Sequence, residues 1–374
     1  MAGDDLTLLR QTVRSAFTEL SPAAVVRQQM ATLRGWDNQV WSRLCTELGL
    51  AGLAVPEEYG GSGGSAVDLG VVFEEAGRAL LTAPLFANAA LAAPLLLALD
   101  DEQANHRYLP GISDGSLVAT VVTADAAGVS IPEVVPFSAS ERGGIPVLTG
   151  YASFVVDGVF ADLILVPART AEGLGVFAVE AEAAGLRVPP LVTLDETRKQ
   201  GQLFLDETPA RRVGEGDATA AFRRALDIAR VLLANEQVGA AAYCLEATVE
   251  YAKTRIQFGR PIGSFQAVKQ KVAEQLILVE SARSAAMTGA ESAAGLPGAP
   301  DLTIAAAVAQ SYCSEVFVTV TAEMIQLHGG IGFTWEHEAH LYYKRAWTSR
   351  ELLGAPAQHL ETLARTLTDA PVAH

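Results

Sequence analysis

Residues 254–274 read TRIQFGRPIGSFQAVKQKVAE, and residues 326–346 read QLHGGIGFTWEHEAHLYYKRA. Each stretch follows a long run of residues with helical periodicity and interrupts that run with glycine or proline. We expect Gly259 and Pro261 to end the helix in the first stretch, because proline cannot continue a helix and glycine readily takes turn conformations. A pair of glycines at 329 and 330 ends the helical run in the second stretch. Helices that end in this way predict a helical domain in the C-terminal part of the chain.

The helices around these two stretches are expected to be long. We predict an N-cap at Asp217 and, after it, a helix of about ten turns that leads into the first stretch. A second helix is predicted from about residue 264 to 294, and the segment GLPGAP at 295–300 makes the next turn. Asp301 is predicted to cap a third helix that reaches His328. Antiparallel helices of this length predict a four-helix bundle.

The chain before this bundle has two different patterns. Helical spacing of apolar residues continues to about Gly115. From Ser116 to about Arg212, short β-branched runs such as LVATVVT and GVFAVEA alternate with turns, which is typical of a small β-barrel or sandwich. The sequence therefore predicts an α+β fold with an N-terminal helical domain at 1–115, a middle β domain at 116–214 and a C-terminal four-helix-bundle domain at 215–374.

The composition excludes several classes of partner. A formal net charge of -16 argues against binding to nucleic acid or an anionic membrane surface, because phosphate binding needs clustered Lys and Arg. Half of the residues are apolar and only 19% are charged, which favours an oligomer. The three cysteines, Cys45, Cys244 and Cys313, lack metal-ligand spacing, so we expect reduced core thiols and no metal site.

One run resembles a membrane span in its apolarity. Residues 80–99 read LLTAPLFANAALAAPLLLAL, but Pro84, Pro94 and Asn88 interrupt the run, so we expect buried helices. The first twenty residues carry no apolar core of signal-peptide length. We therefore expect a cytoplasmic protein.

The two stretches together resemble the FAD-dinucleotide-binding segments of the acyl-CoA dehydrogenase family, and the likeness extends over nearly the entire chain. The family's fold has the predicted order of a helical, a β and a bundle domain, and its bundle builds a tetramer. In that family these segments reach the FAD of a neighbouring subunit. An arginine suits the task because a guanidinium can hold a diphosphate through paired charged hydrogen bonds. The resemblance implies FAD as cofactor, with contacts from Arg255, Phe258, Gln266, Gln326, Leu327, His328, Gly329 and Gly330.

Other interpretations of these residues remain open. Arg255 could complement the C-terminal end of its helix, and glycine ends many helices that bind nothing. We expect His328 to be a packing or backbone-contact residue and not a base.

The family's catalytic base is absent from both of its usual positions. The reaction removes the α-proton of an acyl thioester with a carboxylate while a hydride passes to the flavin. Counting from Gly332 without a gap places the usual glutamate at Leu353, and counting from Arg255 places the alternative position at Ala229. Neither side chain can take a proton. Glu246 and Glu351 are the first candidates for a relocated base.

The middle domain also departs from the family pattern. The family's loop Thr-Glu-Pro-x-Ala-Gly-Ser-Asp, which holds the flavin ring, corresponds to TADAAGVS at 123–130, where Thr123, Ala127 and Gly128 are retained. A Trp-Ile-Thr strand beside the ring is replaced by FVV at 154–156. This replacement removes a hydroxyl hydrogen-bond partner.

We therefore interpret the chain as a subunit of an α2β2 acyl-CoA dehydrogenase, similar to actinobacterial enzymes that act on steroid side-chain or other bulky acyl-CoA thioesters. A homologous partner subunit would supply the base and the ring pocket, and an electron-transfer flavoprotein would accept the electrons. Two alternatives are a self-sufficient homotetramer with a relocated base and a flavin-free protein that binds CoA thioesters or acts as a scaffold. The sequence does not identify the acyl chain or exclude an oxidase.

Overall fold

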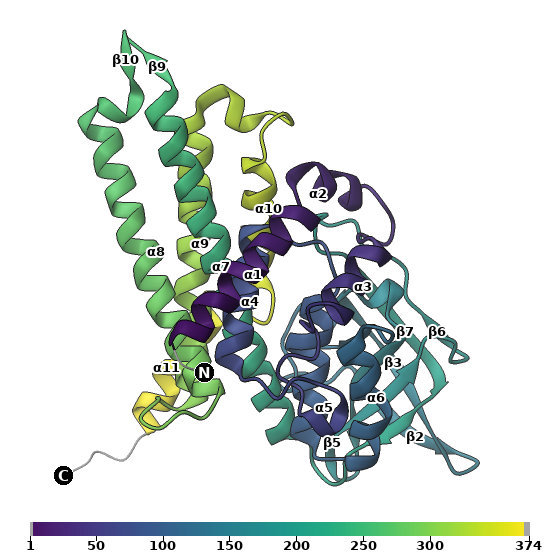
Figure 1. Cartoon of the computed structure of the whole chain (residues 1–374). Coiled ribbons are helices and arrows are strands. Elements are labelled where there is room, and N and C mark those ends of the chain that lie inside the picture. Colours follow the sequence, from purple (N-terminus) through teal and green to yellow (C-terminus); the bar gives the residue numbers. More distant parts are fainter. Residues whose placement is uncertain (1–2, 370–374) are drawn as a thin grey trace, which may run out of the picture. The chain divides into compact units, whose positions relative to one another are not determined.

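The computed structural model describes residues 3–369 and divides them into two compact units (Figure 1). The first unit comprises residues 3–26, 70–81 and 230–369. The second comprises residues 27–69 and 82–229. Helices α4 (Ala66–Arg78) and α7 (Thr219–Thr254) each begin in the second unit and end in the first.

The first unit is built from long helices. Asn235 of α7 donates to the carbonyl oxygen of Ala286 of α8 at 3.4 Å, while α8 packs on α9, and α9 also contacts α10 and α11. The predicted second and third helices are confirmed, and Asp301 caps α9 by accepting hydrogen bonds from the backbone N–H groups of Thr303 and Ile304. Besides the parts of α4 and α7, the helices are α1 (Gly3–Leu20), α8 (Gln266–Ala293), α9 (Leu302–His328), α10 (Ala339–Glu351) and α11 (Pro356–Asp369).

Helix α7 begins close to the predicted cap and ends earlier than predicted. Asp217 lies two residues before the helix and accepts hydrogen bonds from the backbone N–H and the hydroxyl of Thr219. The helix ends at Thr254, not at Gly259 and Pro261. Strands β9 (Ile256–Gln257) and β10 (Arg260–Pro261) form a short hairpin there, with positive φ at both turn residues, 51° at Phe258 and 76° at Gly259. The prediction that Gly259 and Pro261 end the helix is therefore wrong, because the glycine lies in the turn of a β-hairpin.

Helices α4 and α7 cross in direct backbone contact at two glycines. A β-carbon on Gly77 would lie 1.8 Å from the carbonyl oxygen of Glu236, and one on Gly239 would lie 1.7 Å from that of Glu74. Both distances are far below van der Waals contact. Since glycine has no β-carbon, these two positions set how closely the helices approach.

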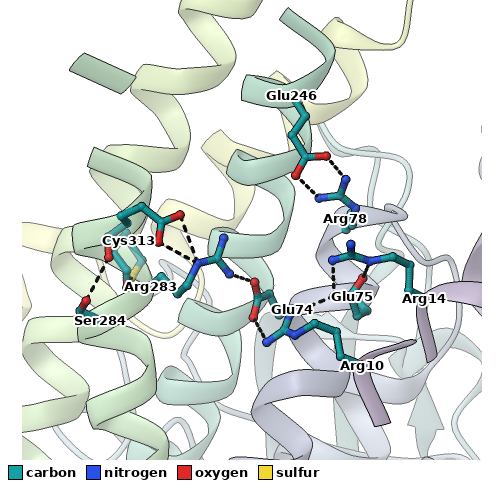
Figure 2. A network of polar contacts seen from close by, with 11 residues as sticks. Arg10, Arg14, Glu74, Glu75, Arg78, Glu246, Arg283, Ser284 and Cys313 are labelled. Carbon is teal, nitrogen blue, oxygen red and sulfur yellow. Dashed lines mark hydrogen bonds and ion pairs between the residues drawn. The ribbon is translucent and has the colours of Figure 1, made fainter. Parts of the chain in front are cut away.

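Charged side chains of α4 join this helix to α1, α7 and α8 through ion pairs (Figure 2). Glu75 accepts from Arg14 at 2.8 Å and from Arg10 at 3.0 Å, while Glu74 pairs with Arg10 and with Arg283 of α8. Arg78 at the end of α4 forms a bidentate pair with Glu246 of α7. Both adjacent glutamates are buried, so the network satisfies charges that would otherwise be costly to bury.

The second unit combines short helices with one sheet. Its helices include α3 (Asn38–Thr46), the π-helix η2 (Phe86–Ala92), α5 (Ala93–Leu99) and α6 (Glu102–Asp114). It also contains the 3-10 turn η1 (Glu57–Tyr59) and the end of α2 (Ala23–Met30), a helix that begins in the first unit. The polar Asn88 in the apolar run 80–99 is fully buried. Its side chain donates to the carbonyl oxygen of Leu117 and accepts from the backbone N–H of Ala119, both at 2.9 Å. This run therefore forms buried helix that is hydrogen-bonded to the first strand.

Eight strands form one mixed sheet in the order β6-β7-β3-β2-β4-β5-β8, with β1 parallel to β4. The predicted α+β fold is thereby confirmed. The hairpin between β2 and β3 was not predicted, because its first strand, FSASER at 137–142, carries polar residues at nearly every second position. Gly143 and Gly144, both with positive φ, form the turn of this hairpin. The strands are β1 (Ala119–Val121), β2 (Phe137–Arg142), β3 (Ile145–Val156), β4 (Leu163–Thr170), β5 (Gly173–Glu180), β6 (Leu186–Arg187), β7 (Gln200–Pro209) and β8 (Arg211–Val213).

One helix in the described part of the chain is long and apolar enough to cross a membrane. It covers residues 302–333, not the run 80–99 that stood out in the sequence, and 61% of its most apolar window is buried within the protein. A buried core helix passes the same test of length and composition. The finding is therefore weak evidence for a membrane span.

Candidate cofactor-binding site

The hairpin after α7 presents an arginine and an aromatic ring on the surface of the first unit. The backbone of Arg255 is fixed, since its N–H donates to Tyr251 at 2.8 Å and its carbonyl oxygen accepts from Ile262 at 2.9 Å. Within residues 3–369 no hydrogen bond or ion pair engages its guanidinium group. Phe258 is 92% exposed at the hairpin turn. A held backbone with a free cationic side chain is the arrangement that anion binding needs.

The surroundings of Arg255 are basic although the whole chain is acidic. Residues 251–273 contain no Asp or Glu and five cationic residues, in a chain of net charge -16. Lys253 and Lys271 are neutralised by Glu250 and Glu323, and Arg260 lies 4.1 Å above the ring of Phe265. The cations that no carboxylate of the described chain neutralises, Arg255, Arg260 and Lys269, give the segment a local positive charge that favours a phosphate group. The exposed Gln266 begins α8 directly beside this hairpin.

The second predicted segment ends α9 with exposed backbone. Gln326 is exposed, and Gly329 has a positive φ of 64°, which glycine adopts without strain. A β-carbon built on Gly329 or on Gly330 would meet no other atom within 4 Å. Packing inside the described chain therefore does not require glycine at 330. The open space leaves room for a ligand or another chain to approach the backbone.

His328 brings the two predicted segments together. Its ring is buried and stacks on the ring of Tyr251, with centroids 4.3 Å apart. The Tyr251 hydroxyl donates to the carbonyl oxygen of His328 at 3.3 Å. Because Tyr251 lies in the last turn of α7, directly before Arg255, this stack joins the end of α7 to the end of α9. Sequence reasoning missed Tyr251, because its role depends on a contact with His328, which is distant in the sequence.

Leu353, where the sequence count predicts the family's glutamate position, lies in a tightly fixed turn after α10. Leu353 is 5% exposed and has a positive φ of 63°. Its carbonyl oxygen accepts from Nε of Arg230 at 3.1 Å, and the next carbonyl oxygen, that of Gly354, accepts from Nε2 of His359 at 2.9 Å. Burial, followed by the nearby Arg230 charge, lowers the pKa of His359 to about 4, so the ring is neutral at pH 7. The turn thus carries an apolar side chain and a neutral imidazole, without a carboxylate.

The other candidate positions for a base offer no free carboxylate. Ala229 is fully buried within α7. Glu246 is bound to Arg78 in the network of Figure 2, and Glu351 pairs with Arg350 at 2.6 Å.

In the second unit, the loop corresponding to the family's flavin-ring loop is closed by its own side chain. The Asp125 carboxylate accepts hydrogen bonds from the backbone N–H groups of Ala127 and Val129, both at 2.8 Å. The backbone carbonyl oxygen of Asp125 accepts from the backbone N–H of Gly128. These N–H groups are therefore already satisfied within the loop. On β3, Val155 and Val156 are buried and provide only apolar side chains, while Phe154 is 42% exposed. The loop therefore has no free N–H group at Ala127, Gly128 or Val129 for the polar edge of a flavin ring. The hairpin of the first unit, in contrast, has at Arg255 a guanidinium group that is free among the described residues and available for a diphosphate.

Three comparisons identify the family. The sequence profiles of the acyl-CoA dehydrogenase N-terminal and C-terminal domains match residues 3–116 and 218–368. The acyl-CoA dehydrogenase IpdE2 of Mycobacterium tuberculosis is 36% identical over 98% of this chain and 99% of its own length. The solved structure of the Tcur3481-Tcur3483 steroid acyl-CoA dehydrogenase is 32% identical, with a TM-score of 0.88 over 99% of both chains. The ChsE4-ChsE5 complex from Mycobacterium tuberculosis contains a chain that is 28% identical, with a TM-score of 0.90 over 100% of this chain and 99% of that one.

The chain belongs to the acyl-CoA dehydrogenase family. The members of this family are oxidoreductases that act on acyl-CoA thioesters and are generally FAD-dependent flavoproteins. The fold predicted from the two stretches is the fold of this family.

Proposed function

We propose that this chain is a subunit of an FAD-dependent acyl-CoA dehydrogenase that contacts the dinucleotide of a partner's FAD and has no catalytic base of its own. One contrast carries the proposal. The Arg255 guanidinium is exposed and without a partner in the described chain, whereas the family's base position is the buried Leu353. The chain therefore keeps the charge that suits a diphosphate and lacks the group that would deprotonate a thioester.

Each segment of the first unit has a role in this proposal. Arg255 would bind the diphosphate through charged hydrogen bonds, and the exposed ring of Phe258 would pack on the nucleotide. Gln266 and Gln326 have exposed side chains that could donate to nucleotide oxygens. Leu327 and His328 would position the segment, while Gly329 and Gly330 would let the backbone approach the cofactor.

FAD, when bound, would accept the hydrogen that leaves the β-carbon during α,β-desaturation of the acyl-CoA. The base that takes the α-proton would come from the partner subunit, because Leu353 and Ala229 cannot accept a proton. The satisfied loop at Asp125 and the apolar Val156 support a ring site on the partner rather than on this chain.

The relatives support a proposal for the assembly and the substrate class. A steroid acyl-CoA dehydrogenase and a complex of two different chains are among the structures that this chain resembles over nearly its full length. We therefore propose an α2β2 heterotetramer with a homologous subunit, acting in the cytoplasm on a steroid-type or other bulky acyl-CoA, with electron-transfer flavoprotein as acceptor. The three-domain division at residues 115 and 214 is part of the same proposal.

An arginine replacement in the assembled enzyme tests the dinucleotide role. Arg255→Ala would be co-expressed with a homologous subunit that retains the glutamate, and bound FAD would be measured by absorbance after gel filtration. Loss of a charged hydrogen-bond partner is expected to weaken FAD binding on the order of tenfold to a hundredfold. Arg224→Ala, at another exposed arginine of α7, is the matched control and is expected to retain FAD. Full FAD retention in Arg255→Ala would contradict the proposal.

A further inference from the structure

The contacts of His328 link three segments of the first unit. The ring lies between Tyr251 of α7, with centroids 4.3 Å apart, and His337 of the segment before α10, with centroids 4.4 Å apart. Its own helix holds it through the carbonyl oxygen of Met324, 2.7 Å from Nδ1. The ring thus stacks on Tyr251, contacts His337 at a tilt of 52° and is held at one edge by its own helix, directly before the two glycines that end α9.

The surroundings of His328 favour a neutral ring. Since a carbonyl oxygen can only accept, Nδ1 of His328 carries the proton and donates to Met324. His337 uses its own Nδ1 to accept from the backbone N–H of Ala339 at 3.0 Å, so that nitrogen is unprotonated. Burial lowers the pKa of His328, and the neighbouring His337 lowers it further, while the bond to Met324 opposes the shift. The groups that face the ring are therefore a phenol, an imidazole and a carbonyl oxygen, none of which is an anion at neutral pH.

The same ring sets the position of both proposed dinucleotide-binding segments. Tyr251 is joined to Arg255 by a backbone hydrogen bond of 2.8 Å, and the carbonyl oxygen of His328 accepts from the Tyr251 hydroxyl. Gly329 and Gly330 follow His328 directly in the chain. Movement of this one ring would consequently shift the arginine on one side and the glycine backbone on the other.

We propose that His328 is a positioning residue that holds the Arg255 hairpin and the Gly329–Gly330 turn at the separation that a dinucleotide requires, and that it does so only as the neutral imidazole. This inference rests on the proposed function, because the ligand is the FAD dinucleotide. A proton on Nε2 would place a buried cation against the imidazole of His337, and the contacts among the three rings would loosen.

The test uses the assembled enzyme, in which this chain is co-expressed with a homologous subunit that retains the glutamate. FAD is the probe, because its diphosphate does not titrate near neutral pH, and its binding would be followed by fluorescence anisotropy. His328→Asn keeps an amide that can donate to the Met324 carbonyl oxygen but cannot titrate, and His328→Ala removes the ring. For the wild type, affinity is expected to be level above about pH 6.5 and to fall on the order of tenfold for each pH unit below the depressed pKa. His328→Asn is expected to be independent of pH, and His328→Ala is expected to bind more weakly at every pH. His106→Asn, at an exposed histidine of α6, is the matched control and is expected to follow the wild type.

Hydrogen exchange separates this inference from the proposed function. In the wild type, residues 251–266 and 326–333 are expected to exchange faster at low pH after correction for the intrinsic rate, whereas in His328→Asn they are not. If no variant binds FAD but exchange follows this pattern, the dinucleotide role is wrong and the positioning role of His328 stands. Equal FAD affinity in His328→Ala and wild type, or the same pH dependence of exchange in His328→Asn, would overturn the inference.

Discussion

Nε of Arg230 donates a hydrogen bond of 3.1 Å to the carbonyl oxygen of Leu353. The arginine lies on α7, and the leucine lies in the turn after α10, which the sequence count predicts as the position of the family's catalytic glutamate. This bond and the His359 bond to Gly354 hold the turn in a backbone conformation that leucine rarely adopts, at a φ of 63°. The turn is therefore a defined element of the first unit although its side chain is inert.

Replacing Arg230 with alanine is expected to destabilise the chain. The Leu353 carbonyl oxygen would lose a charged donor in a buried turn, and such losses cost about 1–3 kcal/mol. Urea unfolding followed by circular dichroism measures the change. Arg224→Ala, on the exposed face of the same helix, is the control and should change stability by less than about 0.5 kcal/mol. Equal stability of the two variants would show that the arginine does not hold the turn.

His359 is expected to make stability depend on pH. Its pKa is lowered from 6.5 to about 4, so the unfolded chain binds a proton more readily than the folded one. Stability is therefore complete above about pH 6.5 and is lost as the pH falls toward 4. The full effect is about 3 kcal/mol by linkage. Unfolding of wild type and His359→Gln across this range would measure it, and the variant should have the smaller slope. Identical slopes would exclude His359 as the cause.

Gly239→Ala is expected to disrupt the crossing of α4 and α7. The added β-carbon would lie 1.7 Å from the carbonyl oxygen of Glu74, and a backbone atom cannot rotate away as a side chain can. We expect a loss of more than about 3 kcal/mol or failure to fold, beyond ordinary overpacking. Gly330→Ala is the control, because its β-carbon meets nothing within 4 Å. Wild-type stability in Gly239→Ala, measured by thermal melting, would mean that the two helices are not in backbone contact.

Glycine and proline positions together with helical periodicity predicted most of the fold. The helices capped near Asp217 and Asp301 follow from capping chemistry, and both were found close to their predicted starts. The end of α7 was misplaced because the sequence does not distinguish a glycine that ends a helix from one in a two-residue hairpin. Strand β2 was missed because alternate polar residues in FSASER weaken its apolar pattern.

The candidate site was only partly accessible to sequence reasoning. Arg255 and the glycine pair carry local signals, so they could be selected one by one. Tyr251, Arg230 and His359 could not, because their roles depend on contacts between segments distant in the sequence. The ion network at Glu74 and Glu75 depends likewise on arginines of α1 and α8 (Figure 2).

The most direct test of the central claim is the flavin content and reactivity of this chain purified alone and with a homologous subunit that has the glutamate. The account predicts that the isolated chain lacks stoichiometric FAD and that its absorbance does not change when acyl-CoA is added. The two-subunit assembly should contain FAD and lose its flavin absorbance with a steroid-type acyl-CoA. An isolated chain that purifies with stoichiometric FAD and is bleached by acyl-CoA would contradict the account, because it would have to contain a base of its own.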